Sequence, residues 1–195
     1  SWSMKILFKT ISAKVTKTDL LVLLSPEGRA PKLPLGVSIP KSVLTSFLGK
    51  SRETRFADTI DGPAERVLLI GLGKGKSFDL ETVRRAAAIA AQKAERTDAA
   101  SVSFWVDLKL GKSAVEFGQA LGEGLVMGAH RLVDFKRSPK QNSLKKVVIQ
   151  SSKEVSSGVK TGSIVGEGNT FARRLQDTPA NKMRPKDMVA EARKI

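Results

Sequence analysis

The residues from 67 to 77, VLLIGLGKGKS, are strand formers that end in three glycines, two lysines and a serine. Such a loop holds phosphate when its backbone amides surround the anion and a helix follows. A phosphate-binding loop would need glycine five positions before Gly75, where Ile70 stands. A dinucleotide-binding loop would need its third glycine at Lys76. The spacing therefore favours a tight strand-to-helix turn, and anion binding by Lys74 and Lys76 is the alternative.

The only histidine, His130, lies near the end of a glycine-rich segment that we expect to be helical. A single imidazole there is more typical of contact with helix-terminal carbonyls than of a base or a metal ligand. No serine lies in the Gly-x-Ser-x-Gly turn that exposes a nucleophile. The sequence therefore offers no nucleophile and base that could work together.

Carboxylates are the other residues that could do chemistry. Four of them fall in separate loops and strand ends: Asp19, Asp58, Asp61 and Asp107. Helical spacing places Glu116 and Glu123 on one helix face, which we interpret as a solvated surface. We therefore predict no catalytic residue, no cofactor-binding residue and no metal ligand in this chain.

Positive charge is the strongest bias of the composition: 34 Lys and Arg against 19 Asp and Glu give a net charge of +15. This balance favours anionic partners. The richest basic stretch, from Arg131 to Lys146, would contact phosphates without reading bases. Aromatic residues make up only 5% and tyrosine is absent, so no base-stacking platform is indicated. A nucleic-acid-binding module remains an alternative function, with weak, salt-sensitive DNA contact as its expected form.

The chain of 195 residues can form one domain with a core and the beginning of a second. Its 41% hydrophobic and 27% charged residues are typical of a globular protein. Cysteine is absent, which excludes disulfides and thiolate zinc sites. No apolar run is long enough to span a membrane, and we expect no export leader. Residues 1–3, before Met4, are expected to be an expression remnant.

The elements that must position these residues alternate between strands and helices. Apolar runs and alternating patterns predict strands at 4–11, 19–25, 52–58, 67–71, 101–107 and 146–150. Helical spacing predicts helices at 42–48, from 79, from 113, at 157–176 and from 185. The order predicts a layered α/β fold with a mixed, largely parallel sheet flanked by helices, followed by a long linker helix.

Several expectations concern the helices themselves. Asp79 should cap the second helix, and Ser113 with Glu116 should form a capping box for the third. Glycines repeat every four residues along the third helix, which would let it approach a neighbour closely. The fourth helix is expected to carry Ile164, Gly168, Phe171 and Leu175 on one face.

Three blocks of the sequence resemble one family. They are RVLLIGLGKGKSFDLETVRRAAAIAAQKA, FGQALGEGLVMGAHRLVDFK and GEGNTFARRLQDTPANKMRPKDMVAEARKI. Together they resemble the amino-terminal part of the leucyl (cytosol) aminopeptidase family over about residues 19–195. Residues 171–181 resemble its linker helix and Asn-Thr-Pro-x-Asn turn. Asp177 stands where asparagine is common, and Arg184 stands where a capping threonine is usual.

The resemblance implies a parent enzyme that removes amino-terminal residues from peptides with two divalent ions, zinc or manganese. Those ions would be held in a carboxy-terminal domain, and no position of this chain matches their ligands. The amino-terminal portion would then be non-catalytic. It would pack against its own catalytic domain in a cytoplasmic hexamer, limit access to the active sites and, in some bacterial relatives, contact DNA.

The resemblance also implies a macro-domain-like fold at 4–155, a linker helix at 156–178 and the start of a catalytic domain at 179–195. Macro domains bind ADP-ribose. A free-standing domain that binds ADP-ribose or a related anion near Gly71 to Lys76 is therefore a further alternative.

Overall fold

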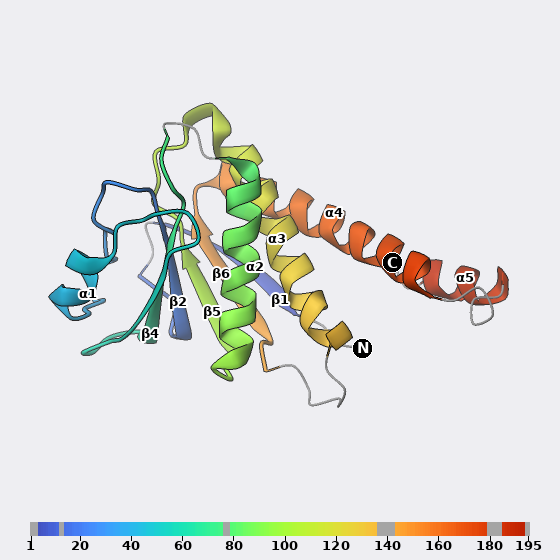
Figure 1. The fold of residues 1–195 in the computed structure, drawn as a ribbon, viewed down its shortest axis with the longest axis horizontal. Coiled ribbons are helices and arrows are strands. Elements are labelled where there is room, and N and C mark those ends of the chain that lie inside the picture. Colours follow the sequence, from blue (N-terminus) through green and yellow to red (C-terminus); the bar gives the residue numbers. More distant parts are fainter. Residues whose placement is uncertain (1–3, 12–13, 76–78, 136–142, 179–184, 194–195) are drawn as a thin grey trace.

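Six strands form one sheet in the order β1-β6-β5-β2-β4-β3 in the computed structural model (Figure 1). Every neighbouring pair is parallel except β3 with β4, which is antiparallel. The structure describes residues 4–11, 14–75, 79–135, 143–178 and 185–193. The predicted mixed, largely parallel α/β sheet is confirmed.

The strands of the sheet are β1 (Lys5–Thr10), β2 (Thr18–Ser25), β3 (Thr54–Asp58), β4 (Ala64–Gly71), β5 (Ser101–Trp105) and β6 (Lys146–Ser151). The helices are α1 (Lys41–Ser46), α2 (Leu80–Arg96), α3 (Ala114–Phe135), α4 (Lys153–Asp177) and α5 (Pro185–Ala192), with a 3₁₀ turn at Gly111–Ser113. Each predicted strand and helix is present, and most bounds differ by only a few residues.

The central strands are buried on both faces of the sheet. In β2, Leu20 and Val22 face the core that α2 and α3 cover, whereas Leu21 and Leu23 face a second, smaller core. Val43 and Leu44 of α1 pack against that second core. This arrangement explains why the sequence of β2 is almost continuously apolar rather than alternating.

The two edge strands are more polar. In β1, Lys5 and Lys9 are exposed and Leu7 is 45% exposed. At the other edge, β3 pairs only with β4, and Arg55 is exposed. The strand predicted at 4–11 is therefore a half-exposed edge strand.

Side chains cap the helices that follow β4 and β6. Asp79 Oδ1 accepts a hydrogen bond from the Glu81 backbone N–H at 3.1 Å, which confirms the predicted cap of α2. Ser152 Oγ accepts from Val155 N–H at 3.3 Å. That cap explains why α4 begins before residue 157, where the sequence places its start.

The predicted capping box of α3 is wrong. Ser113 already lies in the 3₁₀ turn, and its backbone N–H donates to Leu110 O at 3.0 Å. A capping residue has extended backbone angles. The chain is therefore already helical before Ser113, so Ser113 is not the capping residue of α3.

The apolar face predicted for α4 is not the face that packs against the fold. Ile164 is 74% exposed, and Gly168 has open space where a Cβ would be. The buried face of α4 instead carries small residues, with Gly158 and Gly162 among them. Apolar periodicity predicted the face that carries Ile164. It missed the face that carries Gly158 and Gly162, because glycines contribute no hydrophobic signal.

Glycines bring the backbones of α3 and α4 into direct contact. A Cβ at Gly118 would overlap the carbonyl oxygen of Val155, and a Cβ at Gly162 would overlap that of Gln119. On its other side α3 meets α2, where a Cβ at Gly124 would overlap the carbonyl oxygen of Arg84. The four-residue glycine spacing thus places α3 between two closely packed helices, as predicted.

A pair of alanine substitutions tests this contact. Gly162→Ala is expected to destabilise the fold by about 1–3 kcal/mol, because the methyl group forces α3 and α4 apart. Gly168→Ala, in open space on the same helix, is expected to stabilise it by about 0.5–1 kcal/mol through helix propensity. Urea unfolding of both variants checks the prediction. Two equal and small effects would contradict it.

Candidate functional site

The glycine loop after β4 uses its backbone amides within the fold. Three successive N–H groups donate to carbonyl oxygens: Gly71 to Glu53 at 2.8 Å, Leu72 to Ser25 at 2.9 Å and Gly73 to Gly49 at 2.9 Å. A Cβ at Gly71 would overlap Lys50 O. The glycines therefore permit close approach of two loops, as expected of a tight turn, and anion binding by this loop stays a prediction. Lys76 lies outside the described residues.

The four aspartates considered as ligands lie apart and have structural partners. Asp19 Oδ2 accepts from Ala100 N–H at 2.8 Å, Asp58 lies 3.2 Å from Arg66 Nε, Asp61 Oδ1 accepts from Gly62 N–H at 2.7 Å, and Asp107 lies 3.6 Å from Lys32 Nζ. Asp19 joins the beginnings of β2 and β5. The others stabilise turns or exposed pairs.

His130 contacts a neighbouring helix rather than helix-terminal carbonyls, so that expectation is wrong. Its Nε2 lies 2.9 Å from Glu167 Oε2, and Arg174 Nη2 lies 3.4 Å from its Nδ1. A neutral ring that donates from Nε2 to Glu167 can accept from Arg174 at Nδ1. Because α3 continues to Phe135, the imidazole faces α4 instead of an open helix end.

Glu123 is not part of a solvated face, which corrects the expectation from helical spacing. Its side chain is only 9% exposed, and its Oε2 accepts from Arg84 Nε at 2.6 Å. Gln119 Nε2 donates to its other oxygen at 3.0 Å. Glu116, by contrast, is exposed as expected. Sequence gives no signal for the Arg84 pairing, because the partners lie on different helices.

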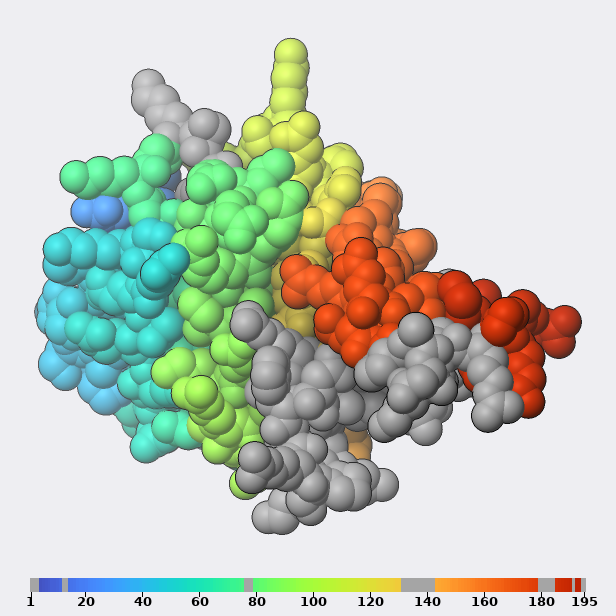
Figure 2. Space-filling view, turned by 45° about the vertical axis from the view of Figure 1, so that its right-hand side comes forward, coloured from blue at the N-terminus to red at the C-terminus, as the bar shows by residue number. Residues whose placement is uncertain are grey.

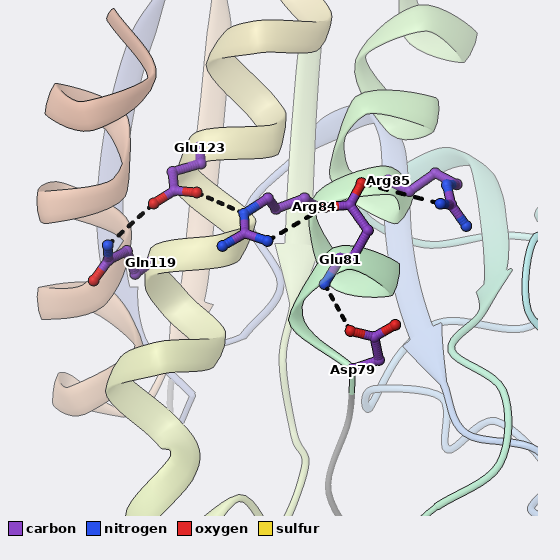
Figure 3. Close-up of polar contacts among 6 residues, drawn as sticks. All are labelled: Asp79, Glu81, Arg84, Arg85, Gln119 and Glu123. Carbon is purple, nitrogen blue, oxygen red and sulfur yellow. Dashed lines mark hydrogen bonds and ion pairs between the residues drawn. The ribbon is translucent and has the colours of Figure 1, made fainter. Parts of the chain in front are cut away.

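Arg84 forms a polar cluster with Glu81, Arg85, Gln119 and Glu123, named here the Arg84 cluster. It connects the amino-terminal end of α2 to α3 (Figure 3). The guanidinium also lies 3.3 Å from Glu81, whose other carboxylate oxygen is 4.0 Å from Arg85. The hydrogen bond to Glu123 raises the pKa of Arg84 above its ordinary value. A guanidinium that stays charged and has two acidic partners is suited to holding helices together.

The basic stretch at 131–146 is largely beyond what the structure describes, including Lys136, Arg137 and Lys140. At its end, Lys145 is exposed and Lys146 begins β6. DNA contact by this stretch therefore stays a prediction.

Within the described ranges, no three His, Cys, Asp or Glu side chains gather closely enough to hold a metal ion. The helices in those ranges are also too short or too polar to cross a membrane. The four aspartates, Glu123 and His130 are engaged with other parts of the fold, whereas Glu116 is exposed.

Comparison with known proteins decides the family. The family model described as "Cytosol aminopeptidase family, N-terminal domain" matches residues 42–139. The chain belongs to this family. The resemblance read from the three sequence blocks is thereby confirmed.

Curated relatives agree with the assignment to the cytosol aminopeptidase family. A probable cytosol aminopeptidase of Roseiflexus castenholzii is 30% identical over 188 residues, covering 92% of this chain and 38% of the relative. That of Aquifex aeolicus is 29% identical over 189 residues, covering 96% and 37%. The chain thus spans less than two fifths of the length of these relatives.

Solved structures share the fold. A mutant of tomato leucine aminopeptidase superposes with a TM-score of 0.72 at 21% identity, covering all of this chain and 42% of that one. The bottromycin maturation enzyme BotP gives a TM-score of 0.66 at 24% identity, covering 90% and 36%. These likenesses establish the α/β fold alone.

The Arg84 cluster predicts a difference between two glutamates. Glu123→Gln is expected to cost about 1–2 kcal/mol of stability, because Arg84 loses a charge-assisted bond while its exposed part keeps some hydration. Glu65→Gln removes the same charge from an exposed site and is expected to change stability by less than about 0.5 kcal/mol. Denaturant unfolding measures both. Similar losses in the two variants would refute a special role for Glu123.

Proposed function

We propose that this chain is the amino-terminal domain of an enzyme that releases amino-terminal residues from peptides, and that it supports the enzyme without performing the chemistry. Membership of the aminopeptidase family supports the first part. The second part is supported by one observation. The loop amides at Gly71–Gly73, the four aspartates and Glu123 all have partners within the fold.

Hydrolysis would depend on two divalent ions, zinc or manganese, which polarise the scissile carbonyl and supply hydroxide. One solved BotP structure, 25% identical to this chain, is described as a complex with Mn. The described residues of this chain do not fit such a centre, since they offer no group of three potential ligands. We therefore assign the metal ions to a catalytic domain of the full-length protein.

The proposed division places an α/β domain at 4–155, a linker helix at 156–178 and the start of the catalytic domain at 179–195. Two features of α4 support a connecting role. Its glycine face packs on α3, while Ile164 on another face is 74% exposed. Exposed apolar side chains on a helix are typical of contact surfaces. We assign Ile164 to contact within a homo-oligomer, the hexamer implied by the family resemblance, and place the protein in the cytoplasm.

Activity measurements test the proposed division of labour. The 195-residue chain with added Mn²⁺ is expected to release no p-nitroaniline from leucine p-nitroanilide, because its described residues offer no group of three potential metal ligands. The full-length protein is expected to release it. Turnover by the purified chain that survives removal of contaminating peptidases would overturn the non-catalytic assignment.

Assembly of the full-length protein tests the role of Ile164. Ile164→Asp is expected to lower the fraction of hexamer seen by sedimentation velocity, because a charge replaces an apolar contact. Leu35→Asp is the matched control, since Leu35 is 90% exposed in the connection between β2 and α1. It should leave assembly unchanged. An unaltered hexamer in the Ile164 variant would contradict the assignment.

A further inference from the structure

A groove of about 760 Å³ runs along α3, between α2 and the carboxy-terminal half of α4. Figure 2 shows the surfaces of α2 and α4 on either side of it. Arginines line both walls, two from α2 and two from α4: Arg84, Arg85, Arg173 and Arg174. This hollow, named here the arginine groove, belongs to none of the features that the proposed function uses.

The groove is a consequence of the glycine contacts of α3. Gly124 and Gly128 lie in its floor and bring α2 onto α3, since a Cβ at Gly128 would lie 2.6 Å from Ala88 Cα. Because glycine and alanine occupy these positions, this part of the floor carries few side-chain atoms and is apolar. Met127 and His130 of α3 also line the groove, and the arginines of α2 and α4 line it from either side.

The charges of the groove are only partly compensated. Its lining carries four arginines against two carboxylates, Glu81 and Asp177. Glu123 of α3 forms an ion pair with Arg84, and Glu81 forms ion pairs with both Arg84 and Arg85. The exposed Arg173 side chain makes no hydrogen bond or ion pair with the described residues. On the α4 wall, Arg174 lies 3.4 Å from His130 Nδ1, whereas Arg173 presents its guanidinium N–H donors to the groove.

Guanidinium groups select a particular ligand chemistry. Their planar fork of N–H donors matches two oxygens of one carboxylate or phosphate. Arginines on opposite walls suit a molecule with an anionic group at each end, and the apolar floor suits the uncharged part between them. The two carboxylates on the rim would repel a long, continuous phosphate backbone, which favours a small ligand over nucleic acid.

We propose that the arginine groove is a binding site for a small ligand that carries at least two anionic oxygen groups, either phosphates or carboxylates. Arg173 contributes a bidentate contact from the α4 wall, and Arg84 and Arg85 form the α2 wall. Arg84 keeps its place through Glu123 and mainly shapes the groove.

Isothermal titration calorimetry with pyrophosphate and with citrate tests this site at constant ionic strength. Wild type is expected to show saturable one-site binding to at least one of the two probes, and the probe that binds identifies the anionic group. Arg173→Gln should weaken that binding about tenfold or more, because a charge-assisted bond is lost. Arg173→Lys should weaken it as well, since a single ammonium cannot make the paired contact.

The control is Arg55→Gln, which removes the same charge from an exposed arginine at the β3 edge of the sheet. It should leave the affinity unchanged. Equal weakening by Arg55→Gln and Arg173→Gln would overturn the proposal, because it would reveal general attraction to a basic protein. So would the absence of saturable binding of either probe up to about 10 mM. Binding of duplex DNA that Arg173→Gln weakens, without binding of either small anion, would also refute the small-ligand site.

Discussion

The arrangement of the helical layer depends on backbone contact between α3 and its two neighbours. Glycines on α3 and α4 meet the opposite carbonyl groups directly, and Gly124 does the same toward α2. Helices that pack through side chains are usually 8–10 Å apart. Contact through glycine brings them closer and leaves little freedom in their relative position. The contacts of α3 with Arg84 and Ala88 of α2 and with the glycine face of α4 therefore depend on the same small residues.

This close packing determines where polar groups end up. Glu123 is buried between helices and needs the guanidinium of Arg84, because an unpaired buried carboxylate is costly. His130 lies 2.9 Å from Glu167 on α4 for a related reason: the helices approach closely along this side of α3. Interhelical polar pairs thus supplement the glycine contacts. In a family of hydrolases, this region of the protein uses its acidic residues mainly for architecture.

Sequence reasoning recovered the order of strands and helices because periodicity and turn residues are local signals. It also anticipated the cap at Asp79, which involves neighbours in the chain. It failed where the decisive partner was distant, as for Glu123 and His130. The buried face of α4 was not recognised for a related reason. Glycine carries no hydrophobic signal, so only the facing helix reveals that Gly162 is buried.

The borders of the sheet limit how the molecule can associate. A strand at the margin presents unpaired backbone groups to any other extended chain, and lysine side chains discourage such pairing. β1 carries exposed lysines at Lys5 and Lys9, and β3 runs against the direction of its five companions. The sheet therefore resists growth by strand addition at its β1 margin.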